Sequence, residues 1–189
     1  MQLGRNKHVQ DKLRDEVNHH SDSNGKVSYE TLNEMPYLDQ VFNEALRMHS
    51  PATFTSRTCT EPITLNFEGK TALVEKGINV YVPIHQLHYD PEYYPEPDKF
   101  NPERFDPENG GLKAFKDKGV FLPFGDGPRM CLGMRFAALQ SKAGVAAIIR
   151  NFEISVNKKT ADKLVIHPKE FINIKVGGLW LDFKQIGSL

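Results

Sequence analysis

The residue of this sequence best suited to chemistry is a cysteine in a glycine-rich loop. Cys131 lies near the end of the ten-residue stretch from Phe124 to Gly133, and Arg129 stands two residues before it. Glycine permits a left-handed backbone and close approach, so this loop can turn its N–H groups toward one point. Those N–H groups, the helix expected after the loop and the Arg129 cation all favour a thiolate over a thiol.

Two interpretations of this cysteine differ in function. Phe124 is expected to shield the sulfur from water, and a shielded, hydrogen-bonded thiolate suits the axial position of an iron porphyrin. The alternative is a buried structural cysteine beside a glycine-rich turn, which is the usual interpretation of a lone cysteine. Because all ten positions of the loop have a chemical reason for their residue type, the porphyrin ligand is favoured.

Three motifs, in the same order, give the chain a resemblance to a known family. The loop matches the pattern F-x-x-G-x-R-x-C-x-G of the cytochrome P-450 haem-thiolate monooxygenases at every fixed position. Glu44 and Arg47 match the E-x-x-R of that family, and residues 100–105 resemble its P-E-R-F segment. The resemblance covers essentially the whole chain. Residues 100–105 and 133–136 look most like animal microsomal, xenobiotic-metabolising enzymes, insect ones among them.

The resemblance implies haem b (iron protoporphyrin IX) as the cofactor, with Cys131 as the axial ligand of its iron. Arg129 matches the family position that pairs with a haem propionate. The other loop positions that match cofactor-binding residues are Phe124, Gly125, Gly127 and Gly133. The family usually offers a second cation for a propionate, but the aligned position here is Phe54, with Arg57 three residues later.

Glu44 and Arg47 are i, i+3 neighbours on one helix face, beside an apolar stripe. If they are buried, each charge needs a partner, and removal of one leaves the other stranded. By resemblance, Arg104 is the third member of this cluster, which ties residues 100–105 to the helix and holds the cysteine loop under the haem. The alternative is a solvated Glu–Arg pair that contributes little to stability.

The predicted fold class is α+β, mainly helical, and by resemblance it is the C-terminal portion of the cytochrome P-450 fold. Helices are expected over 6–18, 28–35, 36–50 and 134–150, and strands of a small antiparallel sheet over 63–67, 71–74 and 78–82. A packed, proline-rich meander is expected over 83–128, and a C-terminal β-hairpin over 172–183 with its turn at 177–178. The 134–150 helix is apolar on most sides, so we expect it to be buried all round.

By resemblance, two segments line a pocket for an apolar substrate. They contain Ala52, Thr53 and Phe54 on one side, and Gly178 and Leu179 on the other. Ordinary turn and strand packing explains the same residues nearly as well.

The composition excludes several classes of protein. The 24 Lys+Arg balance 24 Asp+Glu, so a charge-neutral chain has no bulk electrostatic reason to bind nucleic acid. Two cysteines form no disulfide framework, and Cys59 is expected to be a small core residue. His85 and His88 stand three residues apart without a nearby third ligand, so we do not expect zinc there.

By resemblance, the full-length protein is a monooxygenase that inserts one oxygen atom from dioxygen into an apolar small molecule. Its electrons come from NADPH through NADPH–cytochrome reductase, with cytochrome b5 as a further partner. The family is held on the cytoplasmic face of the endoplasmic reticulum membrane by an N-terminal anchor, which this sequence lacks. A basic face is expected to dock the reductase, or else to be merely solvated; it contains Lys113, Lys116, Lys118, Arg135 and Lys142.

Residues 1–189 are therefore expected to be the C-terminal part of one cytochrome P-450 domain and not a complete independent domain. The oxygen-binding helix of the family lies upstream of the stretch present here, so this chain alone is expected to be inactive. Two alternatives stay open. One is a truncated, catalytically inactive haem-binding or interaction module, and the other keeps the haem fold but carries out a rearrangement or dehydration.

Overall fold

The computed structural model describes all residues except 163–164, 171 and 187–189. The helices are α1 (Gln2–Arg5), α2 (Lys7–His19), α3 (Tyr29–Leu32), α4 (Pro36–Met48), α5 (Ile84–His88), α6 (Gly111–Asp117) and α7 (Met134–Asn151). The strands are β1 (Thr55–Thr58), β2 (Ile63–Phe67), β3 (Lys70–Val74), β4 (Asn79–Val82), β5 (Phe152–Val156) and β6 (Leu181–Gln185). Short 3-10 turns are η1 (Pro102–Phe105), η2 (Pro107–Asn109) and η3 (Gly127–Arg129). The mixed, mainly helical class is confirmed.

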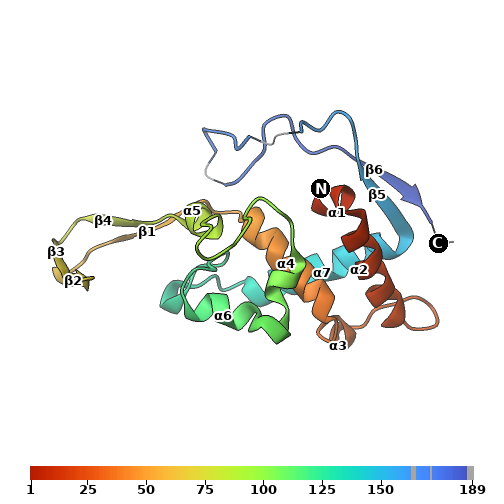
Figure 1. The fold of residues 1–189 in the computed structure, drawn as a ribbon, viewed down its shortest axis with the longest axis horizontal. Helices are drawn as coiled ribbons and strands as arrows, with labels where there is room; N and C mark the ends of the chain where they lie inside the picture. The colour runs from red at the N-terminus through yellow and green to blue at the C-terminus, as the bar shows by residue number, and fades with distance from the viewer. Residues whose placement is uncertain (163–164, 171, 187–189) are drawn as a thin grey trace.

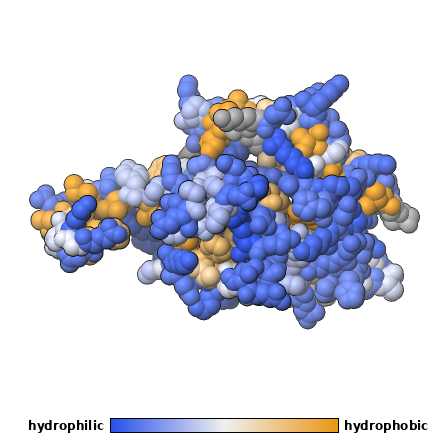
Figure 2. Space-filling model, in the orientation of Figure 1, coloured by the Kyte–Doolittle hydropathy of each residue, from blue (hydrophilic) through white to orange (hydrophobic). Residues whose placement is uncertain are grey.

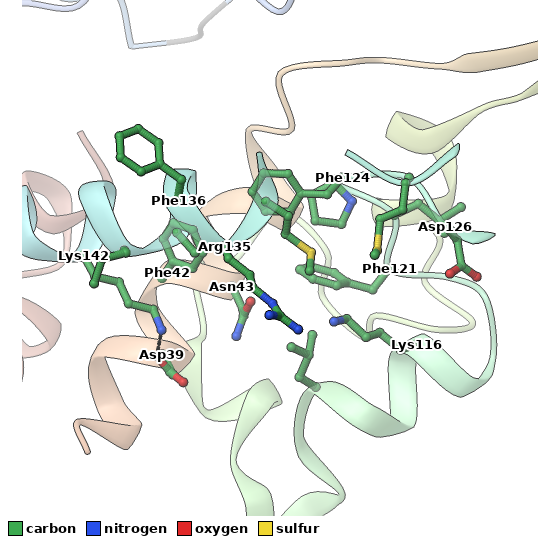
Figure 3. A pocket seen from close by; sticks show the side chains of 18 of the residues that line it. Asp39, Phe42, Asn43, Lys116, Phe121, Phe124, Asp126, Arg135, Phe136 and Lys142 are labelled. Atoms are coloured by element: carbon green, nitrogen blue, oxygen red, sulfur yellow. Dashed lines mark ion pairs between the residues drawn. The ribbon is translucent and has the colours of Figure 1, made fainter. Parts of the chain in front are cut away.

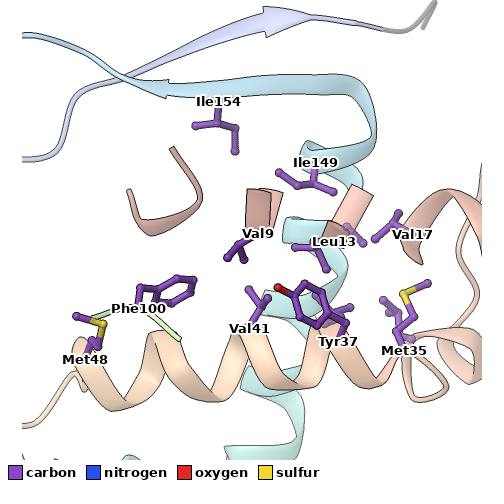
Figure 4. Close-up of a cluster of buried hydrophobic side chains, with 13 residues drawn as sticks. Val9, Leu13, Val17, Met35, Tyr37, Val41, Met48, Phe100, Ile149 and Ile154 are labelled. Carbon is purple, nitrogen blue, oxygen red and sulfur yellow. The ribbon is translucent and has the colours of Figure 1, made fainter. Parts of the chain in front are cut away.

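The main apolar core lies between α2, α4 and α7, and β5 packs against it (Figure 4). On α2, Val9, Leu13 and Val17 are completely buried, as their four-residue spacing predicts. The other buried members of this core are Leu32, Met35, Tyr37, Leu38, Val41, Met48, Phe100, Ala146, Ile149 and Ile154. The helices predicted over 6–18 and 36–50 are confirmed as α2 and α4.

A carboxylate on α2 caps the start of α4. Glu16 accepts hydrogen bonds from the backbone N–H groups of Tyr37, at 2.8 Å, and Leu38, at 2.7 Å. The first N–H groups of a helix have no partner within the helix, so an acceptor from a neighbouring element stabilises its start. This contact sets the position of α4 against α2.

The strands after α4 form an arm that projects away from the helices (Figure 1). β1 pairs with β4 and β2 with β3, both antiparallel, so the predicted strands are confirmed but form two separate two-stranded ladders. The arm leaves apolar side chains exposed (Figure 2), among them Ile63, Leu65, Phe67, Leu73 and Tyr81.

Cys59 lies in this arm, and the expectation that it is a core residue is wrong. Its backbone N–H donates to the Ile78 carbonyl and its own carbonyl accepts from the Gly77 N–H, both at 2.8 Å. The side chain is only partly buried because a two-stranded ladder encloses no core.

The C-terminal strands do not pair as predicted. β6 pairs with β5, from Leu181 opposite Val156 to Gln185 opposite Phe152, instead of turning back on residues 172–176. The turn at 177–178 is present, with both glycines at positive φ, but Ile172 bridges to Ala52 and Ile166 to Lys175. Apolar alternation predicts that a strand forms, but it does not identify the strand's partner.

The segment between the arm and the cysteine loop is packed, as expected. Tyr94, Phe105, Val120 and Phe121 form a second buried cluster, in which the Tyr94 and Phe115 rings stack at 4.8 Å between centroids. The Tyr94 hydroxyl donates to the Val120 carbonyl at 3.0 Å. The segment holds more regular structure than its prolines predict, because α5, α6 and the 3-10 turns fit between them.

The expectation that the 134–150 helix is buried all round is wrong for the described residues. In α7, Ala146 and Ile149 are buried, whereas Phe136 is 69% exposed and Ile148 is 39% exposed. α7 contacts α2, α3, α4 and β5, which leaves these two side chains outside the core. Among the described residues, α7 and the other helices do not reach the length and apolarity needed to span a membrane.

Candidate functional site

The cysteine loop is a closed turn built around two glycines in the left-handed region. Gly125 has a φ of 72° and Gly127 a φ of 67°, where a side chain would strain the backbone. The Asp126 carboxylate accepts from the Gly127 N–H at 2.8 Å, and the Cys131 N–H donates to the Phe124 carbonyl at 2.8 Å. The last bond closes the loop and fixes the cysteine beside its first residue.

Cys131 is exposed and lies three residues before the start of α7. The Met134 N–H donates to the Cys131 carbonyl at 3.2 Å, and Gly133 is the N-cap of the helix, with an ordinary φ of −83°. We expected the loop N–H groups to turn toward the sulfur. Within the described part of the chain, no hydrogen bond ends on Cys131 Sγ. Of the features expected around the sulfur, the helix N-terminus is present, because α7 begins three residues after Cys131.

A cavity of about 920 Å³ lies in front of the cysteine. Its walls come from the cysteine loop, from β1 with the turn before it, and from the start of α5. The lining residues are Pro51, Ala52, Phe54, Thr55, Ser56, Arg57, Thr58, Thr60, Ile84, Pro123, Phe124, Gly125, Arg129 and Cys131. Residues 51–60, which precede Cys131 by about 75 positions in sequence, therefore line the same cavity as its thiol.

The residues of this cavity fit an iron porphyrin. A flat apolar macrocycle with two carboxylates needs apolar walls, cations at its edge and a soft ligand for the iron. Phe54 and Phe124 supply apolar surface, and the thiol of Cys131 is the soft ligand. Arg129 and Arg57 both line the cavity and supply the cations. Phe54, at the position aligned with the family's second cation, lines the same cavity.

The remaining predicted pocket residues lie elsewhere. The Thr53 carbonyl accepts from the His85 N–H at 2.9 Å, at the start of α5. Leu179 lines a different cavity, of about 330 Å³, beside Leu38 and Val145. Gly178 lies in the turn after Lys175, to whose carbonyl its N–H donates at 3.2 Å. The structure therefore brings Ala52 and Phe54 to the thiol, but places Gly178 and Leu179 away from it.

Glu44, Arg47 and Arg104 meet in one buried cluster. Arg47 Nε lies 2.7 Å from Glu44 Oε2, Arg47 Nη2 lies 2.9 Å from Oε1, and both side chains are fully buried. Arg104 Nε lies 3.3 Å from Glu44 Oε1, and the Asn101 N–H donates to the same oxygen at 3.0 Å. The Glu–Arg pair is therefore not the solvated surface pair that was the alternative.

Arg47 also binds residues of the meander. Its guanidinium donates to the carbonyls of His88, at 2.7 Å, and Pro97, at 2.8 Å, and lies 5.2 Å from the Tyr94 ring centroid. These contacts satisfy the buried cation with carbonyl oxygens and an aromatic face. The cluster joins α4 to both ends of the segment between α5 and η1.

Three residues of the predicted basic face, Lys116, Arg135 and Lys142, line a second cavity, of about 630 Å³, on the side of α4, α6 and α7 (Figure 3). Lys116 and Arg135 point toward it in Figure 3. Two of the five predicted cations are paired, because Lys142 binds Asp39 and Lys113 binds Asp117. The positive charge of this face is therefore smaller than a count of its basic residues indicates.

Comparison with known proteins places this chain in a family. A family model described as cytochrome P450 matches residues 1–181, and the chain belongs to the cytochrome P450 family. It is 43% identical over 188 residues to "Probable cytochrome P450 28d2" of Drosophila melanogaster, covering 98% of this chain and 36% of that protein. It is 41% identical over 185 residues to "Cytochrome P450 9e2" of Blattella germanica, covering 97% of this chain and 34% of that protein. The predicted resemblance to insect members is confirmed.

The chain spans about a third of the length of the curated relatives that it matches. "Cytochrome P450 6j1" of Blattella germanica shows the same proportion, with 38% identity over 176 residues, 93% of this chain and 33% of that protein.

Proposed function

We propose that residues 1–189 are the C-terminal part of a single cytochrome P-450 domain, in a haem-thiolate monooxygenase with Cys131 as the iron ligand. The cavity that brings the Cys131 thiol together with Arg57 and Arg129 carries this proposal. Membership of the cytochrome P450 family supports it, because monooxygenation is the activity inferred for that family.

The residues around the cavity hold and tune the cofactor. Cys131, three residues before the start of α7, would hold the iron through its sulfur as a thiolate. Arg129 and Arg57, which line the same cavity, would hold the carboxylates of the cofactor, and Phe124 would shield the sulfur from water once the cofactor is bound. When bound, haem b supplies the activation of dioxygen, from which one oxygen atom enters an apolar small molecule.

The Glu44–Arg47–Arg104 cluster supports the loop without touching the cofactor. It fixes α4 against the segment that leads to the cysteine, so its role is to position the loop. Ala52 and Phe54 line the edge of the cavity where an apolar substrate approaches. Gly178 and Leu179 belong to the pocket only if the C-terminal turn is placed differently in the full-length protein.

Family membership also supports a proposal for the electron donors and the location. NADPH–cytochrome reductase, with cytochrome b5 as a second donor, supplies electrons on the basic side, where Lys116 and Arg135 face an acidic partner. The full-length protein works at the cytoplasmic face of the endoplasmic reticulum membrane on apolar foreign compounds.

The test is oxygen incorporation by the natural protein that contains this chain. It is expressed with haem and assayed with reductase, NADPH, ¹⁸O₂ and an apolar alkane probe, whose alcohol product keeps the inserted oxygen atom. The proposal expects NADPH-dependent product, one ¹⁸O atom incorporated per turnover, and loss of both on Cys131→Ala but not on Cys59→Ala.

Each alternative gives a different result in the same assay. An inactive haem-binding module would bind haem without NADPH-dependent turnover, and an enzyme of rearrangement or dehydration would form a product without ¹⁸O. Either result would reject the monooxygenase proposal.

A further inference from the structure

His88, at the end of α5, is completely buried and makes hydrogen bonds with both ring nitrogens. Its Nε2 lies 2.9 Å from the Leu122 backbone nitrogen, and its Nδ1 lies 3.0 Å from the Arg47 carbonyl oxygen. Because the Leu122 N–H can only donate, Nε2 is the acceptor and Nδ1 carries the proton that is donated to Arg47. The two contacts therefore require one neutral tautomer.

The surroundings of the ring favour that neutral form. Its plane stacks on Phe121 at 5.5 Å between centroids, and the Arg47 guanidinium donates to the His88 carbonyl. Burial is the main cause that lowers the pKa of His88 to about 4; the hydrogen bond to the Arg47 carbonyl opposes this shift, and the positive charge of Arg47 adds to it. The imidazole therefore stays neutral at physiological pH and keeps one donor and one acceptor in place.

The ring joins two parts of the site that are far apart in sequence. On one side is Arg47, the buried arginine bound to Glu44. On the other side is Leu122, two residues before Phe124. The Phe124 carbonyl accepts the hydrogen bond from the Cys131 N–H that closes the cysteine loop. A chain of hydrogen bonds and two peptide units thus runs from the Glu44–Arg47 pair to the cysteine.

We propose that His88 is a positioning residue for the cysteine loop: its ring transmits the position of the buried Glu44–Arg47 pair to Leu122 and thereby fixes where Cys131 presents its sulfur. This inference rests on the proposed role of Cys131 as a haem ligand. Loss of the ring nitrogens frees Leu122 and the residues that lead into the loop, and the thiolate then binds in a less defined position.

The experiment uses the natural protein that contains this chain, expressed with haem. His88→Phe keeps a flat ring that can stack on Phe121 but removes both nitrogens, whereas His88→Gln keeps one donor and one acceptor. Val17→Ala, in the core of α2, is the matched control because it weakens the fold far from the loop. Two readouts are recorded: amide hydrogen exchange at Leu122 and Cys131, and the thiolate fraction of the reduced carbon monoxide complex.

For His88→Phe we expect exchange at Leu122 to be about tenfold faster, with a smaller increase at Cys131. The thiolate fraction should fall and convert several-fold faster to the thiol-ligated form. His88→Gln should regain part of both properties, and Val17→Ala should lower the unfolding midpoint without changing the thiolate fraction.

Two results would overturn the inference. One is a thiolate fraction in His88→Phe equal to that of Val17→Ala, and the other is unchanged exchange at Cys131. If the wild-type protein itself has no thiolate band, the proposed function fails, whereas the exchange measurements still decide whether His88 fixes the loop.

Discussion

At the residue scale, the site depends on charges that are buried together. Glu44 accepts two bonds from Arg47, one from Arg104 and one from the Asn101 N–H, so both oxygens of its carboxylate are occupied. A buried ion pair adds little net stability compared with an apolar pair, but loss of one partner leaves an uncompensated charge. A single substitution in the cluster should therefore lower the stability of the fold far more than replacement of all its charged residues by apolar ones.

Glu44→Gln should destabilise the protein by about 3–5 kcal/mol, because it keeps the side-chain shape but strands the buried Arg47 cation. Urea denaturation measures the free energy of unfolding. The matched control is Glu103→Gln, whose carboxylate is 44% exposed and pairs with Lys12 at the surface, and it should cost less than about 1 kcal/mol. Equal losses in the two variants would contradict the account.

His88 gives a pH dependence with a defined sign. Burial lowers its pKa from 6.5 to about 4, so between these values the unfolded chain binds a proton that the folded chain does not. The stability that neutral His88 contributes is therefore complete above pH 6.5 and is lost as the pH falls toward 4.

The measured quantity is the difference in unfolding free energy between wild type and His88→Gln at several pH values. It should shrink by up to about 3 kcal/mol between pH 6.5 and 4, because glutamine does not titrate. A difference that stays constant over this range would show that His88 is not held neutral by the fold.

At the scale of the elements, the predictable features are local and the others depend on distant partners. The four-residue spacing of Val9, Leu13 and Val17 identifies α2 and its buried face. Glu16 sits on the same helix, but its role as the cap of α4 cannot be predicted from spacing because its partners come from another element. The pairing of β6 with β5 was missed for the same reason.

The candidate site shows the same division. The loop motif identifies Cys131 and Arg129 because their neighbours in sequence are also their neighbours in space. Arg57 reaches the cavity only because β1 packs beside the loop, and His88 was considered only as a metal ligand. His88 lies within the predicted meander, and its spacing from Arg47 and Leu122 gives no sign that the three residues meet.

The left-handed turn of the cysteine loop makes a prediction for this element. Gly125→Ala places a side chain at a φ of 72° and should destabilise the protein by about 1–2 kcal/mol. Gly133→Ala is the matched control, since its φ is −83° and an added Cβ meets nothing within 4 Å. Urea denaturation without haem should separate the two, and equal effects would show that the loop conformation is not set by Gly125.

At the scale of the whole molecule, the described chain is a helical core that carries an exposed arm and one exposed helix face. Phe67 is 72% exposed on the arm, Phe136 69% on α7, and Leu132 is fully exposed beside the cysteine. Apolar surface of this extent usually marks a contact with another element or partner. It agrees with a chain that spans about a third of the length of its relatives.

The central claim is that Cys131 binds the haem iron as a thiolate, and the reduced carbon monoxide difference spectrum tests it most directly. The natural protein that contains this chain is expressed with haem as wild type, Cys131→Ala and Cys59→Ala. We predict the red-shifted thiolate Soret band in wild type and in Cys59→Ala, and its complete loss in Cys131→Ala. A thiolate band that survives Cys131→Ala would contradict the assignment.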